Sequence, residues 1–293
     1  MTDGAGLPRP GTLVDGRWQL VARIGRGGTG EIWRASSVEN PERRVAVKLL
    51  HRVLSTEGEL VARFEREIAT SMRIDHPNAV RVIGGGRTTD EQPYLVMEEI
   101  RGRPLSIVAA TEAPIGAERV AAIGRQIARG LGAAHAVGVV HRDLKPENVL
   151  VTRDGGGERV VVFDFGLSLA RGDAGIGASR LTARELRIGT PGYMAPEYLA
   201  DGQVDERSDF YALGVVLFEL ASGRMPFVGP PSSVFHQQLH GEPVPLASVC
   251  AAPAWLCDAV DRLLRREPVE RPVDAAAVER SLLPRTSSAP PPR

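Results

Sequence analysis

The chain has 293 residues, of which 43% are hydrophobic, and it carries 36 basic and 36 acidic residues. This apolar content can build a large folded core and excludes a mainly disordered chain. The formal net charge of zero provides no strong overall field, so we expect no nucleic-acid partner and no attraction to an anionic membrane.

The cysteine content and the hydropathy pattern indicate a compartment. Cys250 and Cys257 are too few for a disulfide scaffold and lack the spacing of zinc ligands, which suits a reducing environment. The first residues show no basic-then-apolar signal pattern, and no apolar run approaches the ~18 residues of a spanning helix. We therefore expect a cytoplasmic protein without a membrane span.

The N-terminal third carries mainly strand patterns. Residues 1–16 are rich in Gly and Pro and are expected to form a flexible flank. Apolar residues alternate on both sides of a Gly-rich turn between Trp18 and Ala35, which predicts a β-hairpin. Further strands are predicted at 45–50, 79–83 and 94–98. Between the first two of these, apolar residues recur every four positions at Leu60, Phe64, Ile68 and Met72 and predict a helix.

Beyond Gly102 the apolar spacing becomes helical, and residues 211–221 are apolar on nearly every side. That segment is expected to be a helix in the centre of a second lobe. The predicted fold is α+β and bilobal, with a small β-rich N-terminal lobe that holds one key helix and a larger α-helical C-terminal lobe. The expected domain spans 17–283, with lobes at about 17–98 and 103–283, a hinge at about 98–102 and a Pro/Ser-rich tail at 284–293. A ligand cleft is expected at the hinge.

A glycine-rich run opens the first predicted hairpin. Gly25, Gly27 and Gly30 fit the pattern G-x-G-x-x-G, which dinucleotide-binding folds also use. The residues that follow continue as a β-favouring stretch and do not open a helix, so a hairpin lid whose backbone N–H groups approach phosphates is favoured. A tight turn that requires positive φ is the structural alternative.

A lysine and a glutamate form the next candidate pair. Lys48 lies in the predicted strand at 45–50, where a buried ammonium needs an anion beside it. Glu67 flanks the apolar face of the predicted helix and is the expected carboxylate. A lysine that extends to solvent and a solvated glutamate are the alternatives.

The segment 141–148, HRDLKPEN, concentrates groups of different chemistry. Asp143 is a candidate to accept a hydroxyl proton, Lys145 to neutralise phosphate oxygens and Asn148 to bind a metal. Asp164 follows a predicted strand at 160–163 and offers a second oxygen ligand of the kind that Mg²⁺ prefers. His141 is expected to pack beneath the loop.

These segments, in this order, resemble the protein kinase family from about Trp18 to Pro272, and most of all its bacterial Hanks-type (eukaryotic-like) serine/threonine members. The resemblance includes residues 189–197, GTPGYMAPE, and a late arginine, Arg271, which would pair with Glu197. It implies an enzyme that transfers the γ-phosphoryl group of ATP to serine or threonine hydroxyls of protein substrates, with Mg²⁺, or alternatively Mn²⁺, as its metal.

The family pattern also assigns roles to individual residues. It places Lys48 on the α- and β-phosphates, held by Glu67, and the metal on Asn148 and Asp164. Met97 would be the gatekeeper before the hinge. The residues expected at the ATP site are Ile24, Gly25, Gly27, Gly30, Ile32, Ala46, Lys48, Met97, Glu98, Ile100 and Leu150. Ser71, one turn after Glu67, stands where the family often packs a larger apolar residue.

Substrate type and regulation are inferred from the same resemblance. Lys145 and Thr190 resemble the serine/threonine-directed branch, in which they would meet the catalytic aspartate. Arg142 marks, within the family, enzymes that are switched by phosphorylation of the activation segment. We expect autophosphorylation of Thr182, with Ser179 as the alternative, and pairing of two copies during that reaction. The alternative is that Thr182 is an ordinary loop residue without a regulatory role.

Two other classes of function remain open. A pseudokinase would bind nucleotide or partners without transfer, but the catalytic groups named above are all present. A phosphotransferase that acts on small molecules is disfavoured by residues 189–197, which resemble a platform for protein substrates.

Overall fold

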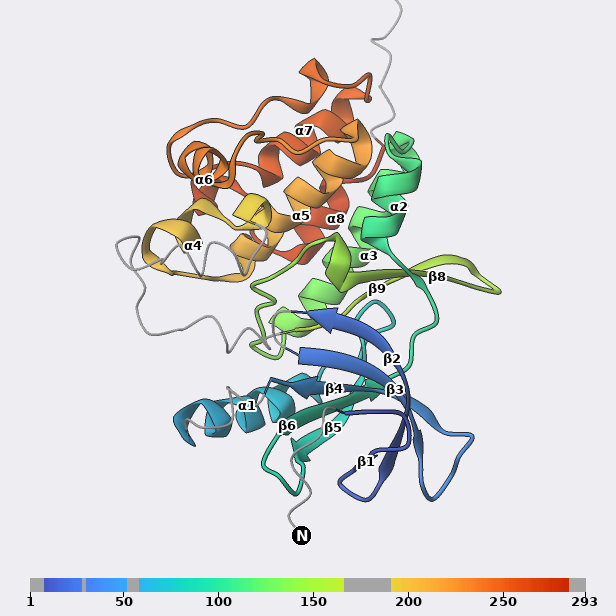
Figure 1. The fold of residues 1–293 in the computed structure, drawn as a ribbon. Coiled ribbons are helices and arrows are strands. Elements are labelled where there is room, and N and C mark those ends of the chain that lie inside the picture. The colour runs from blue at the N-terminus through green and yellow to red at the C-terminus, as the bar shows by residue number, and fades with distance from the viewer. Residues whose placement is uncertain (1–7, 28–29, 52–57, 166–190, 285–293) are drawn as a thin grey trace, which may run out of the picture.

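The computed structural model describes residues 8–27, 30–51, 58–165 and 191–284. Within them a lobe built on a sheet lies beside a helical lobe (Figure 1), which confirms the predicted bilobal α+β fold. The first lobe holds β1 (Leu13–Val14), β2 (Trp18–Gly27), β3 (Gly30–Ser37), β4 (Arg44–Leu50), α1 (Gly58–Ser71), β5 (Val82–Arg87) and β6 (Pro93–Glu98). Its strands pair in the order β1-β2-β3-β4-β6-β5.

The second lobe follows in the chain and holds most of the helices. These are α2 (Leu105–Glu112), α3 (Ala117–His135), α4 (Pro196–Asp201), α5 (Glu206–Ser222), α6 (Pro231–His240), α7 (Ala254–Leu263) and α8 (Ala275–Ser281). A small sheet of β7 (Arg103–Pro104), β8 (Val149–Asp154) and β9 (Gly157–Val162) lies where the two lobes meet (Figure 1).

The predicted hairpin at 18–35 is confirmed as β2 and β3. The two strands run antiparallel, and Gly27 is paired with Gly30 at the turn. A Cβ atom on Gly30 would overlap the carbonyl oxygen of Leu49 in β4. Glycine at this position therefore permits the close approach of two backbones that the sheet needs.

Each face of the six-stranded sheet carries its own apolar cluster. The inner cluster, beside α1 and β9, contains Ile68, Leu95 and Val161. The outer cluster contains Val14, Trp18, Leu20, Trp33, Ala35, Val45, Val47, Leu49, Tyr94 and Val96. Both faces of these strands thus carry buried apolar side chains.

The N-terminal flank contributes to the outer cluster. Val14 of β1 is buried, and the hydroxyl of Tyr94 donates a hydrogen bond of 2.9 Å to Asp15. The prediction of a flexible flank over 1–16 is therefore wrong for its later part. The paired strand is only two residues long, which is too short to produce a periodic pattern.

The helix predicted at 211–221 is confirmed as the buried centre of the second lobe. Phe210, Leu213 and Leu217 of α5 are fully buried, and each such side chain contributes about 1.5–3 kcal/mol by leaving water. The helix begins with a capping box, in which Asp205 accepts from the backbone N–H groups of Arg207 and Ser208. Its first turn is therefore fixed by the sequence itself.

Two local predictions differ from the structure. The strand expected at 79–83 begins at Val82. Before it, the backbone of Asn78 and Val80 bonds to Val162 of β9, so this segment pairs with β9 and does not extend β5. Met72 lies beyond the end of α1 and is 48% exposed.

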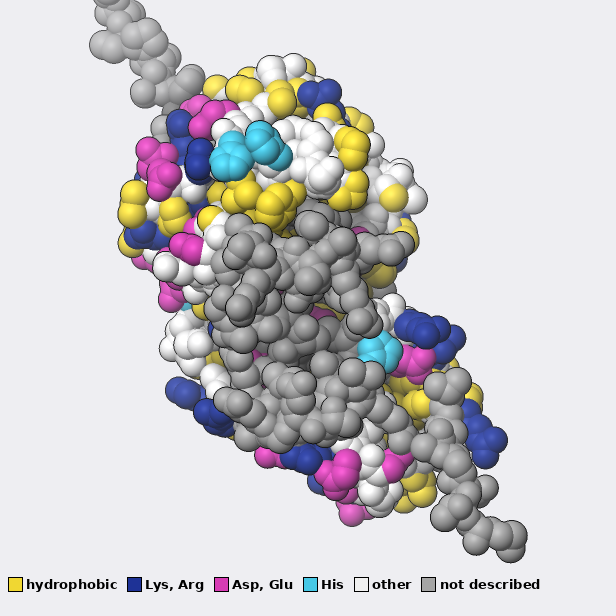
Figure 2. All heavy atoms as spheres, turned by 60° about the vertical axis from the view of Figure 1, so that its left-hand side comes forward, with side chains coloured by type: hydrophobic (Ala, Val, Ile, Leu, Met, Phe, Trp, Pro, Cys, Tyr) yellow, Lys and Arg dark blue, Asp and Glu magenta, His cyan; other side chains and the backbone are white. Residues whose placement is uncertain are grey.

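The surface carries charges of both signs. In the space-filling view, basic and acidic side chains are interspersed over both lobes (Figure 2). Among the described residues, no helix is long and apolar enough to span a lipid bilayer.

Candidate active site

A cavity of about 750 Å³ lies between the two lobes, with walls from the β2–β3 hairpin, the segment after β6 and the 141–148 loop. Nearly all of the residues that the sequence placed at one site meet here. The predicted residues that line it are Ile24, Gly25, Gly27, Gly30, Ile32, Ala46, Lys48, Met97, Glu98, Ile100, Asp143, Lys145, Asn148, Leu150 and Asp164. The cleft is large enough for a nucleotide-sized ligand.

The register of β3, β4 and β6 explains why their wall of the cavity, here called the upper wall, is built from these side chains. Ile32 of β3 pairs with Lys48 of β4, and Ala46 of β4 pairs with Met97 of β6. Residues two apart on a strand face the same side, so Ala46 and Lys48 both face the cavity. At the hairpin tip, a Cβ atom on Gly27 would meet no atom of the described residues within 4 Å, and the Gly27 carbonyl lies 3.3 Å from the ring nitrogen Nε2 of His51.

The ammonium of Lys48 forms an ion pair with the carboxylate of Asp164. Lys48 is only 3% exposed, and a cation so buried requires such a partner. Burial alone would raise the pKa of Asp164, but the charge and the hydrogen bond of Lys48 outweigh it and hold the pKa below its ordinary value. The site thus contains an ionised carboxylate.

The backbone at Asp164 is itself unusual. Its φ of 71° lies in the left-handed region, which costs a residue with a Cβ atom about 1–3 kcal/mol and is found most often at functional sites. The surrounding contacts must hold this conformation.

The loop before β8 presents three polar groups to the same cavity. The carboxylate of Asp143 accepts from the ammonium of Lys145 at 2.9 Å. The amide nitrogen of Asn148 donates to the carbonyl oxygen of Asp143 at 2.8 Å. Because that nitrogen is used within the loop, a cation in the cavity would meet the amide oxygen.

A buried carboxylate anchors this loop to α5. Asp209 accepts from the backbone N–H groups of His141 at 2.8 Å and Arg142 at 2.9 Å, and it shares a hydrogen bond with His135. Arg142 has a left-handed φ of 67°. His141 is fully buried beneath the loop, edge-on to the Phe165 ring at 5.1 Å between centroids, as predicted from the sequence.

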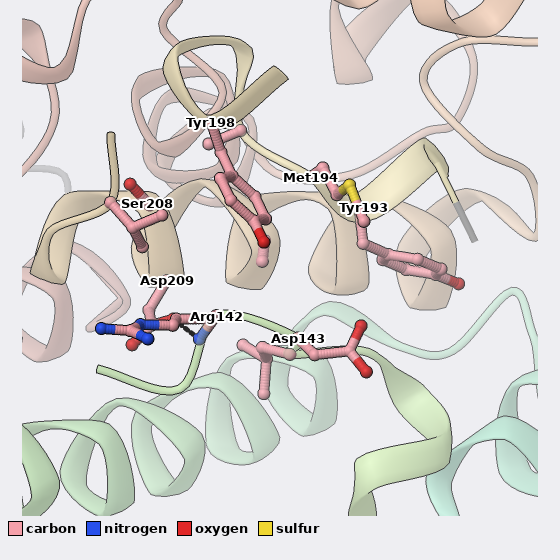
Figure 3. A pocket seen from close by; sticks show the side chains of 11 residues that line it. Arg142, Asp143, Tyr193, Met194, Tyr198, Ser208 and Asp209 are labelled. Atoms are coloured by element: carbon pink, nitrogen blue, oxygen red, sulfur yellow. Dashed lines mark hydrogen bonds between the residues drawn. The ribbon is translucent and has the colours of Figure 1, made fainter. Parts of the chain in front are cut away.

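A second, small cavity also has Asp143 in its wall. Figure 3 shows Arg142 and Asp143 on one side of it and Tyr198 and Ser208, from α4 and α5, on the other. The hydroxyl residues predicted to be regulatory, Thr182, Ser179 and Thr190, lie outside the described residues.

Two predictions on α1 have mixed outcomes. Glu67 is partly buried, and it is not among the residues that line the large cavity. Its predicted pairing with Lys48 stays a prediction. Ser71 is fully buried, so the small side chain does stand at a packed position.

The predicted pair of Arg271 and Glu197 is confirmed. The guanidinium donates to both carboxylate oxygens, at 2.7 Å and 2.8 Å, and the Arg271 side chain is completely buried. The same guanidinium lies 5.0 Å from the ring centre of Tyr211. This bidentate pair fixes the start of α4 to the segment between α7 and α8.

Some lining residues were missed by the sequence analysis. These are Arg26, Arg34, Val80, Glu99, Arg101, Gly102, Pro104, Glu147 and Phe163. A signal existed for Arg34, which is two residues after Ile32 and so shares its strand face, and for Glu99, which lies within the predicted hinge.

Several curated proteins are similar to this chain. It is 37% identical over 272 residues to the serine/threonine-protein kinase pkn2 of Myxococcus xanthus, covering 91% of this chain and 32% of that protein. It is 39% identical over 270 residues to the serine/threonine-protein kinase Pkn1 of the same species, covering 91% of this chain and 38% of that protein. It is 34% identical over 274 residues to the serine/threonine-protein kinase PknL of Mycobacterium tuberculosis, covering 92% of this chain and 66% of that protein. The chain thus spans 32% and 38% of the two Myxococcus proteins.

Solved structures share the fold. A double mutant of the Mycobacterium tuberculosis PknI kinase domain matches with a TM-score of 0.73 at 23% identity, over 94% of this chain and 98% of that one. Rad53 in complex with AMP-PNP matches with a TM-score of 0.73 at 25% identity, over 91% and 66%. The family model described as "Protein kinase domain" matches residues 18–282 of this chain. That range includes both lobes and the cavity between them, and the chain therefore belongs to the protein kinase domain family.

Proposed function

We propose that this chain is a serine/threonine protein kinase that transfers the γ-phosphoryl group of ATP to protein hydroxyls. The observation that carries the proposal is the convergence of the Lys48–Asp164 ion pair with Asp143, Lys145 and Asn148 in one cavity between the lobes. The names of the relatives, which are serine/threonine-protein kinases, support the same activity.

In this proposal the nucleotide lies between the two lobes. The adenine packs against Ile32, Ala46 and Leu150, and its phosphates lie below the glycine hairpin within reach of Lys48. Ile24, Gly25, Gly27, Gly30, Met97, Glu98 and Ile100 complete the ATP site. Positioning by such fixed groups is the main contribution that a protein makes to phosphoryl transfer.

The residues present fit a divalent cation with oxygen ligands. The ionised Asp164 and the amide oxygen of Asn148 line the same cavity and supply the donors that Mg²⁺ prefers. When bound, Mg²⁺, or alternatively Mn²⁺, neutralises charge on the phosphates. Glu67 would hold Lys48 in place from α1.

The chemical step then needs one base and one cation. The substrate hydroxyl oxygen forms a bond to the γ-phosphorus, the bond from that phosphorus to the β–γ bridging oxygen breaks, and ADP departs with the bonding electrons. Asp143 accepts the hydroxyl proton. Lys145, which already donates to Asp143, neutralises charge on the transferred group.

A direct assay tests the activity. The protein is incubated with Mg-ATP and a generic protein acceptor, and phosphoserine and phosphothreonine are measured, with Asp143→Asn as the control. Phosphate on the acceptor only with the wild-type protein supports the proposal. Nucleotide binding without transfer would indicate a pseudokinase, and transfer to small alcohols alone would indicate a small-molecule phosphotransferase.

We also infer that the enzyme is regulated by autophosphorylation of Thr182, with Ser179 as the alternative, and that two copies pair during that reaction. Arg142 immediately precedes Asp143 in the chain, and its guanidinium can donate charge-assisted hydrogen bonds to a phosphate. Thr190 is assigned to the substrate platform. Peptide mapping after incubation with Mg-ATP, compared with Asp143→Asn, tests this; undiminished activity of Thr182→Ala would contradict it.

The location of the protein is proposed on chemical grounds. Cys250 and Cys257 are both free thiols, as suits a reducing compartment such as the cytoplasm. Its partners in this proposal are protein substrates.

A further inference from the structure

An ion pair joins two walls of the large cavity, one formed by β3 and the other by the hinge segment. The guanidinium of Arg34, on β3, donates to the carboxylate of Glu99, which follows β6. Both residues line the cavity. We propose that this pair is a positioning element for the nucleotide, which holds the β3 wall at a fixed height over the hinge.

Strand register places the pair at the adenine end. Arg34 is paired with Ala46 of β4, and Ala46 is paired with Met97 of β6. Arg34 therefore lies two strands from Met97, and Glu99 is two residues further along the chain. The ion pair therefore links β3 directly to the hinge segment, in addition to the backbone pairing through β4 and β6.

The two neighbouring glutamates of the hinge are held from different sides. The Glu98 carboxylate accepts from the backbone N–H of Arg81 at 2.9 Å, and the Glu98 backbone N–H donates to the Arg81 carbonyl at 3.0 Å. Glu98 is thus fixed to the segment before β5. The hydrogen bond from Arg34 fixes Glu99 to β3. The two glutamates thus tie the hinge segment to two different parts of the sheet lobe.

Burial makes the pair asymmetric. The Glu99 side chain is 7% exposed, whereas that of Arg34 is 37% exposed. A carboxylate so nearly buried depends on its partner, while the more exposed arginine can turn to water when the pair is broken. Loss of Arg34 therefore releases Glu99, and the hinge segment with it, from the β3 wall.

The inference rests on the proposed function, because it assumes that the cavity binds ATP. Within that frame the pair acts on the base and not on the phosphates, since Arg34 lies at the hinge end and Lys48 lies at the Asp164 end. Breaking it should weaken binding of any ligand that contains adenine. It should leave binding of a bare polyphosphate and the rate of the chemical step unchanged.

The test compares three ligands on matched variants. Binding of Mg-ATP, adenosine and inorganic tripolyphosphate is measured by calorimetry for wild type, Arg34→Gln, Glu99→Gln and the swapped double variant Arg34→Glu with Glu99→Arg. We expect each single variant to weaken the binding of ATP and adenosine by roughly threefold to tenfold. Tripolyphosphate should be unaffected, kcat should stay within about twofold, and the swap should restore most of the adenosine affinity.

Arg23→Gln is the matched control. Arg23 lies on the same hairpin and also pairs with a glutamate, Glu31, at 3.0 Å, but it does not line the cavity. It should bind all three ligands as the wild type does. In addition, the loss of adenosine affinity in Arg34→Gln should be smaller at about 0.5 M salt than at about 0.05 M salt, because high salt already weakens the partly exposed ion pair in the wild type.

Two results would overturn the inference alone. Wild-type affinity for adenosine in Arg34→Gln would remove the positioning role. Weakening confined to tripolyphosphate would make Arg34 a phosphate ligand instead. If the wild-type protein binds neither ATP nor adenosine, the proposed function itself fails and the inference with it.

Discussion

The ammonium of Lys48 and the carboxylate of Asp164 meet across the lobe boundary, although 116 positions separate them in the chain. Lys48 comes from the centre of β4, and Asp164 follows β9. Each lobe therefore contributes one charge to the same point of the cavity.

Replacing Lys48 with Met should abolish most phosphotransfer while the protein stays folded. Methionine keeps the apolar stem in the buried strand but removes the charge that positions the phosphates, which we expect to reduce activity by about 10²-fold or more. Transfer to a protein acceptor and far-ultraviolet circular dichroism are the measurements. Near-normal activity would show that the ATP site is assigned wrongly.

Asp143→Asn should lower kcat by about 10²-fold or more with little change in the KM for ATP, because asparagine cannot accept the hydroxyl proton. The Asn148 bond to the loop uses the backbone carbonyl of residue 143, so the loop should keep its shape. Asp258→Asn, at an exposed position on α7, serves as the control. A raised KM with unchanged kcat would move Asp143 out of the catalytic role.

Asp164→Asn should differ from Asp143→Asn by changing the magnesium requirement. The pKa of Asp164 is held low by Lys48 despite burial, so the native group is a carboxylate at neutral pH, and asparagine removes its charge. Activity titrated against Mg²⁺ should reach half-maximum at a higher concentration than in the wild type. An unchanged titration would argue against metal binding at this residue.

Arg271→Ala should destabilise the protein strongly. The variant leaves the Glu197 carboxylate, which is 17% exposed, without its bidentate partner, and loss of one member of a buried pair costs about 3–5 kcal/mol. Urea unfolding gives the free energy of unfolding directly. Arg129→Ala, which breaks a pair in which the arginine is 48% exposed, should change it by less than about 1 kcal/mol.

Glu219→Gln should stabilise the protein increasingly as the pH rises. Burial, together with the charge of Glu147, raises the pKa of Glu219 above its ordinary value of 4.5 in spite of the hydrogen bond from Tyr193. A carboxyl with a raised folded pKa contributes stability below its unfolded pKa and loses it as the pH rises through the folded pKa. Glutamine has no such loss.

Thermal melting of both proteins from about pH 4 to about pH 8 checks this. The two melting temperatures should be closest at the acid end, and the variant should gain on the wild type above it. A difference that is constant with pH would mean that Glu219 does not ionise differently in the folded and unfolded chain.

The sequence predicts well what depends on local periodicity. The β2–β3 hairpin and the buried α5 follow from alternating and helical apolar spacing, and the cavity residues come from motifs with fixed order. It could not predict β1, which is too short to show a period, or the partners of Lys48 and Arg34. Those ion pairs join positions 116 and 65 residues apart and are decided by how the strands and lobes pack. The roles assigned to the cavity residues stay predictions.

The outer apolar cluster of the sheet has a consequence for spectroscopy. Of the three tryptophans, Trp18 and Trp33 are buried in that cluster, and Trp255 lies on α7 in the other lobe. Intrinsic fluorescence should therefore report mainly the unfolding of the sheet lobe, while the helical signal in circular dichroism reports mainly the other. Coincident curves would mean that the two lobes unfold as one cooperative unit, and separated curves would mean that each melts by itself.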